Sequence, residues 1–60
     1  MRAQFIGKDR SMGFRRGQWY RIIAIEEKFG KVLLREASGL FCPYSNIGKM
    51  LENWKFDKRY

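Results

Sequence analysis

The stretch WYRIIAIEEKFGKVLLRE, residues 19–36, decides how this 60-residue chain folds. Apolar residues recur at every second position on both sides of a central turn, at Tyr20, Ile22 and Ala24 and again at Val32 and Leu34. A period of two in aliphatic, β-branched and aromatic residues indicates β-strands with these side chains facing the core. Residues 27–30 read EKFG, and Gly30 is able to take the positive φ that ends a type I turn with a bulge. We therefore predict a β-hairpin here.

Shorter strands are predicted on both sides of this hairpin. Residues 1–6 alternate weakly, with Ala3 and Phe5 on one face. After a tight turn at residues 37–39, residues 40–44 form a strand that Pro43 places at an edge or ends, because proline has no N–H for a ladder. Residues 55–60 resume the two-residue period with Phe56 inward, and we expect them to pair with the first strand and close the sheet.

One short helix is predicted between the last two strands. Apolar residues follow the spacing of one helix face at Ile47, Met50, Leu51 and Trp54. Ser45 precedes this run and is a suitable N-cap. Gly48 weakens such a helix by about 1 kcal/mol relative to alanine, so we expect a helix of one to two and a half turns.

A long loop, residues 7–17, separates the first strand from the hairpin. Glycines at both its ends and in its middle break any regular pattern, and its basic side chains are Lys8, Arg10, Arg15 and Arg16. Met12 and Phe14 are expected to pack the tip of this loop back onto the domain. The loop is long for so small a domain, and long ordered loops often carry function.

The order of the predicted elements defines the fold class. Strand, long loop, strand, turn, strand, turn, strand, helix and strand is the topology of a mainly β, Src-homology-3-like small barrel of four or five antiparallel strands with one short C-terminal helix. The chain forms one domain, residues 1–60, and a domain of this size buries only about 60% of its unfolded surface. Cys42 is the single cysteine, so no internal disulfide adds stability and the core depends on aromatic and aliphatic side chains.

Charge is the most pronounced feature of the composition, since 13 Lys and Arg face 6 Asp and Glu, for a net charge of +7. Such a charge attracts polyanions or acidic protein surfaces, and the alternative is a basic protein whose charge only prevents aggregation. The lone Cys42 suits a reducing compartment, and the N-terminus lacks the pattern of a signal peptide. The longest aliphatic run, residues 22–25, is too short to span a bilayer. We therefore expect a cytoplasmic protein with no membrane partner.

The pattern of turn glycines and core aromatics resembles a group of short bacteriophage and prophage proteins with a Src-homology-3-like barrel. The matching positions are Phe5, Ile6, Gly7, Gly17, Tyr20, Gly39, Pro43, Tyr44, Ser45 and Trp54. The resemblance implies a phage origin, a location in the host cytoplasm, and an accessory or host-directed role, which in this group includes inhibitors of bacterial immunity such as anti-CRISPR proteins. The chain departs from the peptide-binding Src-homology-3 domains of eukaryotes, because its long loop is basic and it has no ALYDY-type aromatic motif. Recognition of proline helices is therefore not expected.

Enzyme chemistry is not expected from this set of residues. The chain has no histidine, and Cys42 stands in a strand pattern with no partner to activate it, so it is interpreted as a buried structural thiol. Glu26 and Glu27 are neighbours in a strand and point to opposite faces. The loop glycines lack the spacing of a phosphate loop, and one cysteine with scattered carboxylates makes no zinc site. We predict no catalytic residues, no cofactor and no metal.

The basic loop and its neighbours form the first candidate binding site. Lys8, Arg10, Arg15 and Arg16 cluster in sequence, and Arg21 extends them along the next strand. Aromatic stacking surfaces are offered by Phe14, Trp19 and Tyr60. Basic side chains interleaved with aromatics are typical of single-stranded nucleic-acid sites. The alternative interpretation is a solvated charged loop.

The second candidate is a surplus of apolar residues on the outer side of the hairpin. If the alternating set fills the barrel, then the residues that point outward are Trp19, Ile23, Ile25 and Leu33, joined by Phe41. Either the predicted helix covers them, or the strands bend strongly enough to cover both faces, or they form an exposed patch. An exposed patch of this kind marks an interface with a partner or a homodimer.

Together these features predict a non-enzymatic protein that acts by binding. The preferred function is the capture, and thereby inhibition, of a host protein with an acidic surface, for example a component of antiviral defence. The alternatives are a nucleic-acid-binding accessory protein and a structural role in the virion. The predicted partner-binding residues are Lys8, Arg10, Arg15, Arg16, Trp19, Arg21 and Phe41.

Overall fold

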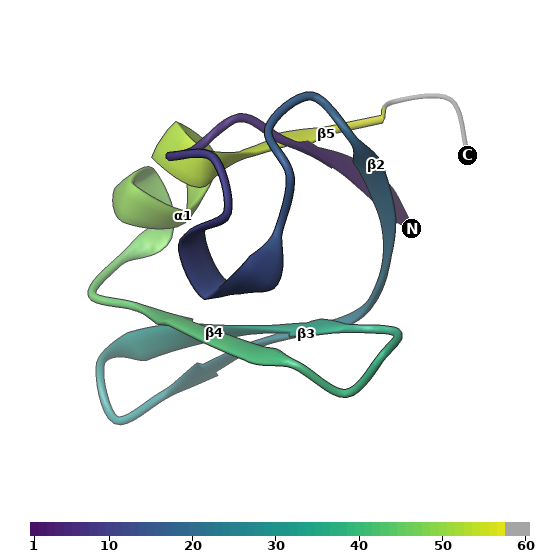
Figure 1. Ribbon diagram of the computed structural model, residues 1–60. Helices are drawn as coiled ribbons and strands as arrows, with labels where there is room; N and C mark the ends of the chain where they lie inside the picture. The colour runs from purple at the N-terminus through teal and green to yellow at the C-terminus, as the bar shows by residue number, and fades with distance from the viewer. Residues whose placement is uncertain (58–60) are drawn as a thin grey trace.

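The computed structural model describes residues 1–57, which form one five-stranded antiparallel sheet and a short helix (Figure 1). The elements are β1 (Arg2–Phe5), the 3₁₀ turn η1 (Ser11–Gly13), β2 (Trp19–Lys28), β3 (Lys31–Glu36), β4 (Phe41–Tyr44), α1 (Ile47–Asn53) and β5 (Trp54–Phe56). The strand order is β4-β3-β2-β1-β5, so β5 pairs with β1 as predicted. The mainly β fold with one short helix is confirmed. The sheet is not closed, because β4 and β5 remain its two edges.

The long strand β2 is shared by two halves of the sheet. Its first residues pair with β1, and the remainder pairs with β3. In Figure 1 the strand curves from the layer that holds β1 and β5 to the layer that holds β3 and β4. Helix α1 joins these two layers at one end, and the core fills the space between them.

A β-bulge in β2 reverses which side chains face the core. Ile22 lies opposite Glu36, but Ala24 lies opposite Arg35, so Ile23 is an extra residue without a partner. Beyond the bulge Ile25 pairs with the buried Leu34 and packs against the core. The prediction that Ala24 points inward and Ile25 outward is therefore wrong, because one inserted residue shifts the alternation by one.

The turn between β2 and β3 is also tighter than predicted. Lys28 pairs directly with Lys31, which leaves Phe29 and Gly30 as a two-residue turn. Their φ angles are 54° and 75°, and two successive positive φ values are typical of a type I′ turn rather than a type I turn with a bulge.

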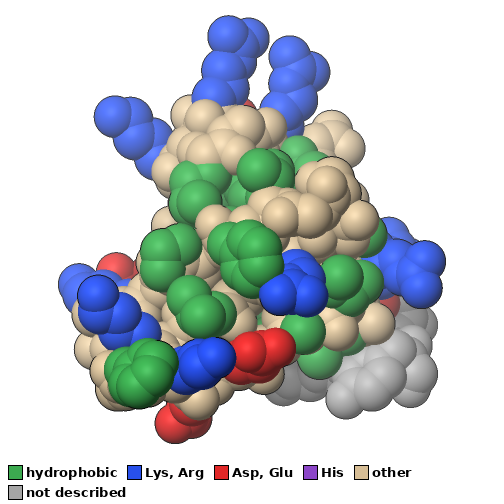
Figure 2. Space-filling model, turned by 90° about the horizontal axis from the view of Figure 1, so that it is seen from below, with side chains coloured by type: hydrophobic (Ala, Val, Ile, Leu, Met, Phe, Trp, Pro, Cys, Tyr) green, Lys and Arg blue, Asp and Glu red, His purple; other side chains and the backbone are tan. Residues whose placement is uncertain are grey.

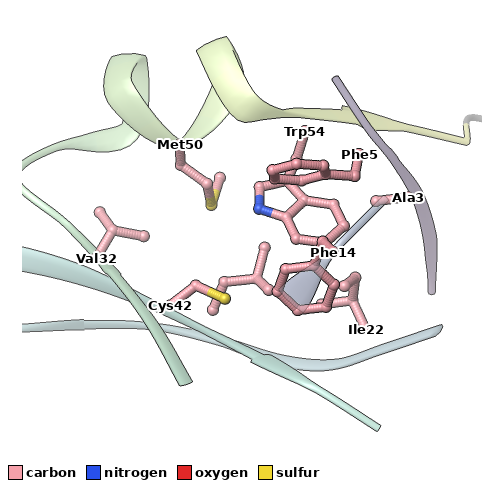
Figure 3. Close-up of a cluster of buried hydrophobic side chains, with 9 residues drawn as sticks. Ala3, Phe5, Phe14, Ile22, Val32, Cys42, Met50 and Trp54 are labelled. Atoms are coloured by element: carbon pink, nitrogen blue, oxygen red, sulfur yellow. The ribbon is translucent and has the colours of Figure 1, made fainter. Parts of the chain in front are cut away.

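The core is built around aromatic rings (Figure 3). Trp54 is fully buried, and its ring contacts Phe5 and Phe14, each at a centroid distance of 5.0 Å. Phe14 comes from the long loop, so this loop contributes a core side chain as predicted, whereas Met12 stays 46% exposed. Figure 3 shows Cys42, Ile22, Val32 and Met50 pointing into the same space from the strands and the helix.

Helix α1 differs from its prediction in its cap and in its buried face. The Oδ1 atom of Asn46 accepts a hydrogen bond from the Lys49 N–H at 2.9 Å, so Asn46, not Ser45, is the N-cap. Met50 is the one buried residue of this helix, and Ile47 and Leu51 are about half exposed. The helix is only two turns long and its chain enters β5 at Trp54, so the predicted apolar face is not buried as a unit.

Candidate partner-binding surface

The outward side of the sheet is a continuous surface that the helix does not cover. We call it the outer face, and its central apolar group consists of Ile23, Ala24, Leu33, Phe41 and Pro43. Ile23 is 51% exposed and Phe41 is 50% exposed. Helix α1 packs on the opposite, inner side, so Ile23, Phe41 and Pro43 are exposed while Ala24 and Leu33 are half-buried. Figure 2, which views the molecule from the β3–β4 side, shows apolar side chains gathered across this face. Of the predicted patch, Trp19, Ile23 and Phe41 are exposed, whereas Leu33 is half-buried and Ile25 packs against the core.

Charged side chains flank this apolar group, and most of them are basic. Lys28, Lys31 and Arg35 lie beside it on β2 and β3, and Glu26 lies directly opposite Leu33. Three further cations, Arg2, Arg21 and Lys55, lie on the outer side of the β1–β5 part, across the bend of β2. Arg2 lies directly opposite Arg21, and Lys28 directly opposite Lys31. Like charges in facing positions of neighbouring strands destabilise a sheet, whereas opposite charges stabilise it. The face thus holds two unfavourable basic pairs, which an acidic partner would relieve.

Two arginines are held over aromatic rings. The guanidinium carbon of Arg35 lies 4.4 Å from the centroid of the Phe41 ring, and that of Arg2 lies 5.3 Å from the Trp19 ring. Both contacts are cation–π interactions, which orient a guanidinium without neutralising it. The planar donor groups of these arginines therefore remain able to bind carboxylates.

The basic loop is ordered by its backbone, and its side chains are exposed. The N–H of Arg15 donates to the Tyr20 hydroxyl at 2.8 Å, and the N–H of Arg16 donates to Oδ1 of Asp9 at 2.9 Å. Within residues 1–57 none of the loop cations has a carboxylate within ion-pair distance, and the ion pair found there joins Lys49 and Glu52 in α1. The hydrogen-bonded backbone of the loop thus holds Lys8, Arg10, Arg15 and Arg16 in place while their side chains stay exposed.

The predicted binding residues fall into three groups rather than one. Lys8, Arg10, Arg15 and Arg16 lie on the loop. Trp19 and Arg21 lie on the part of β2 that pairs with β1, and Phe41 lies beyond the bend, on β4. Phe14 is buried, so the prediction that it offers a stacking surface is wrong. Tyr60, the other predicted stacking residue, lies outside the described residues.

Sequence reasoning missed several members of the outer face. Arg2 alternates with the inward Ala3, so its outward position was readable from the period of two. Arg35 follows the inward Leu34, so its outward position was readable in the same way. The exposure of Ile23 at a bulge had no such signal, because it stands within the uniformly apolar residues 22–25.

A buried polar cluster lies on the inner side of the same strands. Cys42 is fully buried, as predicted, and burial raises the pKa of its thiol above the ordinary value of 9.0, with the nearby Glu36 carboxylate adding to the rise. The Glu36 carboxylate accepts hydrogen bonds from the Ser38 N–H and hydroxyl. A protonated thiol without exposure is a poor nucleophile, so this cluster is not a candidate site. Residues 1–57 hold no group of three potential metal ligands among His, Cys, Asp and Glu.

Comparisons of the chain with protein-family models, with curated proteins and with solved structures find no match. In the described part of the chain, the one α-helix is too short to cross a membrane. The candidate site is therefore the partly exposed apolar group of the outer face, flanked by Lys28, Lys31, Arg35 and the carboxylate of Glu26.

Proposed function

We propose that this protein acts by binding, capturing and inhibiting a host protein that presents an acidic surface to the outer face. The observation that carries the proposal is the exposed pair Ile23 and Phe41 with the half-buried Leu33, flanked by cations that form no ion pair within residues 1–57. Apolar side chains at the centre supply the buried contact, and the arginines and lysines around them select carboxylates.

The size of the molecule is compatible with this role. A stable interface buries about 800 Å² per partner. The total accessible surface of the described chain is 4522 Å², so one face of the sheet would have to supply under a fifth of it.

We further propose that the open sheet belongs to the Src-homology-3-like class of small barrels. A strongly bent second strand shared by two halves, and a short helix before the last strand, support this assignment. The resemblance to short phage proteins supports a phage origin and a host-directed function in the host cytoplasm.

Nucleic-acid binding is the second candidate, and the free loop cations favour it. Lys8, Arg10, Arg15 and Arg16 would contact phosphates. Base stacking has less support, because Phe14 is buried and the Trp19 ring is already engaged by Arg2. We therefore rank this candidate below protein capture.

The proposal is tested by affinity capture from a bacterial lysate with and without nuclease. We expect the wild-type protein to retain a protein partner after nuclease treatment, and the double variant Ile23→Ser/Phe41→Ser to lose it. The matched variant Arg15→Ala/Arg16→Ala should retain the partner. Capture that disappears with nuclease would overturn protein capture in favour of nucleic-acid binding.

A further inference from the structure

The tip of the β2–β3 hairpin presents the most exposed large apolar side chain of the described chain. Phe29 is 92% exposed, and its backbone has φ 54°. A bulky residue is strained in the left-handed region, and a type I′ turn prefers asparagine or aspartate before its glycine. Phe29 is therefore unfavourable both for its turn and for its contact with water.

The residues around Phe29 add a third unfavourable feature. Lys28 and Lys31 flank the turn and face each other across the two strands. Beside the turn is a shallow hollow of about 390 Å³, lined by Glu27, Gly30, Lys31 and Val32 and by Asn46, Ile47 and Gly48 at the start of α1. An aromatic ring, two like charges and an open hollow thus occur at one end of the sheet.

One kind of ligand relieves both the exposure of Phe29 and the repulsion between the two lysines, while the backbone strain at Phe29 remains. An apolar contact removes Phe29 from water, and carboxylates at the rim of that contact neutralise Lys28 and Lys31. A nucleic acid would neutralise the lysines, but the turn offers it one aromatic ring without the arginines of the loop. A second copy of this chain is unsuitable, because it brings another net charge of +7 and the same two lysines.

We infer that Phe29 is an anchor residue, which inserts into an apolar site rimmed by carboxylates on the partner protein while Lys28 and Lys31 pair with that rim. The inference rests on the proposed function and deepens it, because it names the chemistry of the partner's surface. It places a second contact beside the apolar group of the outer face. On this inference the strained Phe29 costs folding stability, and its contact with the partner explains why this residue occupies the turn.

The structure supplies a matched control for testing this inference. Met12 is also an exposed apolar residue with positive φ, at 55°, but it stands on the basic loop. Phe29→Asn and Met12→Asn replace an exposed apolar side chain by asparagine at nearly the same φ. Both variants should fold, and both should raise the Tm by about 4 °C, because asparagine tolerates this conformation better.

Binding is measured with three probes of defined chemistry: a random copolymer of glutamate and tyrosine, polyglutamate, and a 20-nucleotide oligothymidine. We expect the wild-type protein to bind the copolymer more tightly than polyglutamate, because only the copolymer offers aromatic groups. Phe29→Asn should weaken copolymer binding by about tenfold or more and abolish this preference. Met12→Asn should change neither the affinity for the copolymer nor the preference for the copolymer over polyglutamate.

The other outcomes separate the two proposals. If Phe29→Asn binds the copolymer as the wild type does, or fails to raise the Tm, the inference about Phe29 is overturned. If Ile23→Ser/Phe41→Ser still loses binding in that case, the proposed function stands. An equal loss in Met12→Asn would also overturn the inference. Tighter wild-type binding to the oligothymidine than to either polymer would contradict the proposed function itself.

Discussion

Trp54 is the side chain on which the two halves of the core converge. Its ring packs edge-on against Phe5, Phe14 and Tyr20, with centroid distances between 5.0 and 5.9 Å. Its indole N–H donates a hydrogen bond of 2.8 Å to the Tyr44 hydroxyl. A large buried aromatic residue needs such a partner, since an unsatisfied indole N–H in the core is costly.

Removing the acceptor of this bond should therefore destabilise the protein. We expect Tyr44→Phe to lower the free energy of unfolding by about 1–2 kcal/mol, measured by urea denaturation. Tyr20→Phe is the control, because the Tyr20 hydroxyl accepts its bond from the exposed Arg15 N–H and should cost less. An equal loss in both variants would show that the Trp54–Tyr44 bond has no special role.

The pKa of the Cys42 thiol links stability to pH. Burial and the Glu36 carboxylate raise this pKa in the folded state, so the folded protein holds its proton at a pH where the unfolded chain releases it. The resulting stability is complete below the unfolded pKa, near 9.0, and is lost as the pH rises through the folded value.

We therefore expect the free energy of unfolding to fall above about pH 9, and to fall less steeply in Cys42→Ala. Some slope remains in that variant, because burial also raises the pKa of Tyr44. Urea denaturation at several pH values measures the effect, and thiol labelling of the native protein should be slow. Rapid labelling of native Cys42 would contradict the assignment.

At the scale of elements, the cap of α1 is a sharp point of difference between sequence and structure. Asn46 bonds the Lys49 N–H, so Asn46→Ala should lower the free energy of unfolding by about 1 kcal/mol. Ser45→Ala should stay within about 0.5 kcal/mol of the wild type. Urea denaturation of both variants under the same conditions measures the two losses. A larger loss of unfolding free energy in Ser45→Ala than in Asn46→Ala would show that Ser45 is the N-cap.

The strands were predictable because most of them alternate clearly. Ala3 and Phe5 on β1, and Val32 and Leu34 on β3, face the core as their period of two indicates. The bulge at Ile23 was not predictable, since four successive apolar residues look the same in either register. The outward positions of Ile23, Leu33 and Phe41 were predictable from the alternation. Whether they are covered depends on where α1 packs, which the sequence does not show.

The helix shows a different limit of sequence reasoning. The spacing of Ile47, Met50 and Leu51 is that of an apolar face, yet only Met50 is buried. A helix of two turns that spans the gap between β4 and β5 has its orientation set by the strands at its ends. Tertiary constraints of this kind override local periodicity in short elements.

At the scale of the whole molecule, curvature separates two kinds of surface. The sheet bends around the aromatic core, and α1 fills the open end on the inner side (Figure 1). The outer face is left with apolar side chains and with charged side chains that are mostly basic, Glu26 being an exception beside Leu33. A chain with a net charge of +7 then repels copies of itself and attracts acidic partners over distance.

The dependence of binding rates on salt tests this account most directly. The purified partner from the capture experiment is passed over the immobilised protein at about 50 and about 200 mM salt. We expect association to slow and dissociation to stay nearly constant, because rim charges steer the encounter while buried apolar contacts hold the complex. The opposite result would be a fall in affinity on the order of 100-fold between the two salt concentrations. A plot of log affinity against log salt would then have a slope near −3.6, as for about four phosphate contacts. That slope, together with its loss in Arg15→Ala/Arg16→Ala, would contradict protein capture by the outer face.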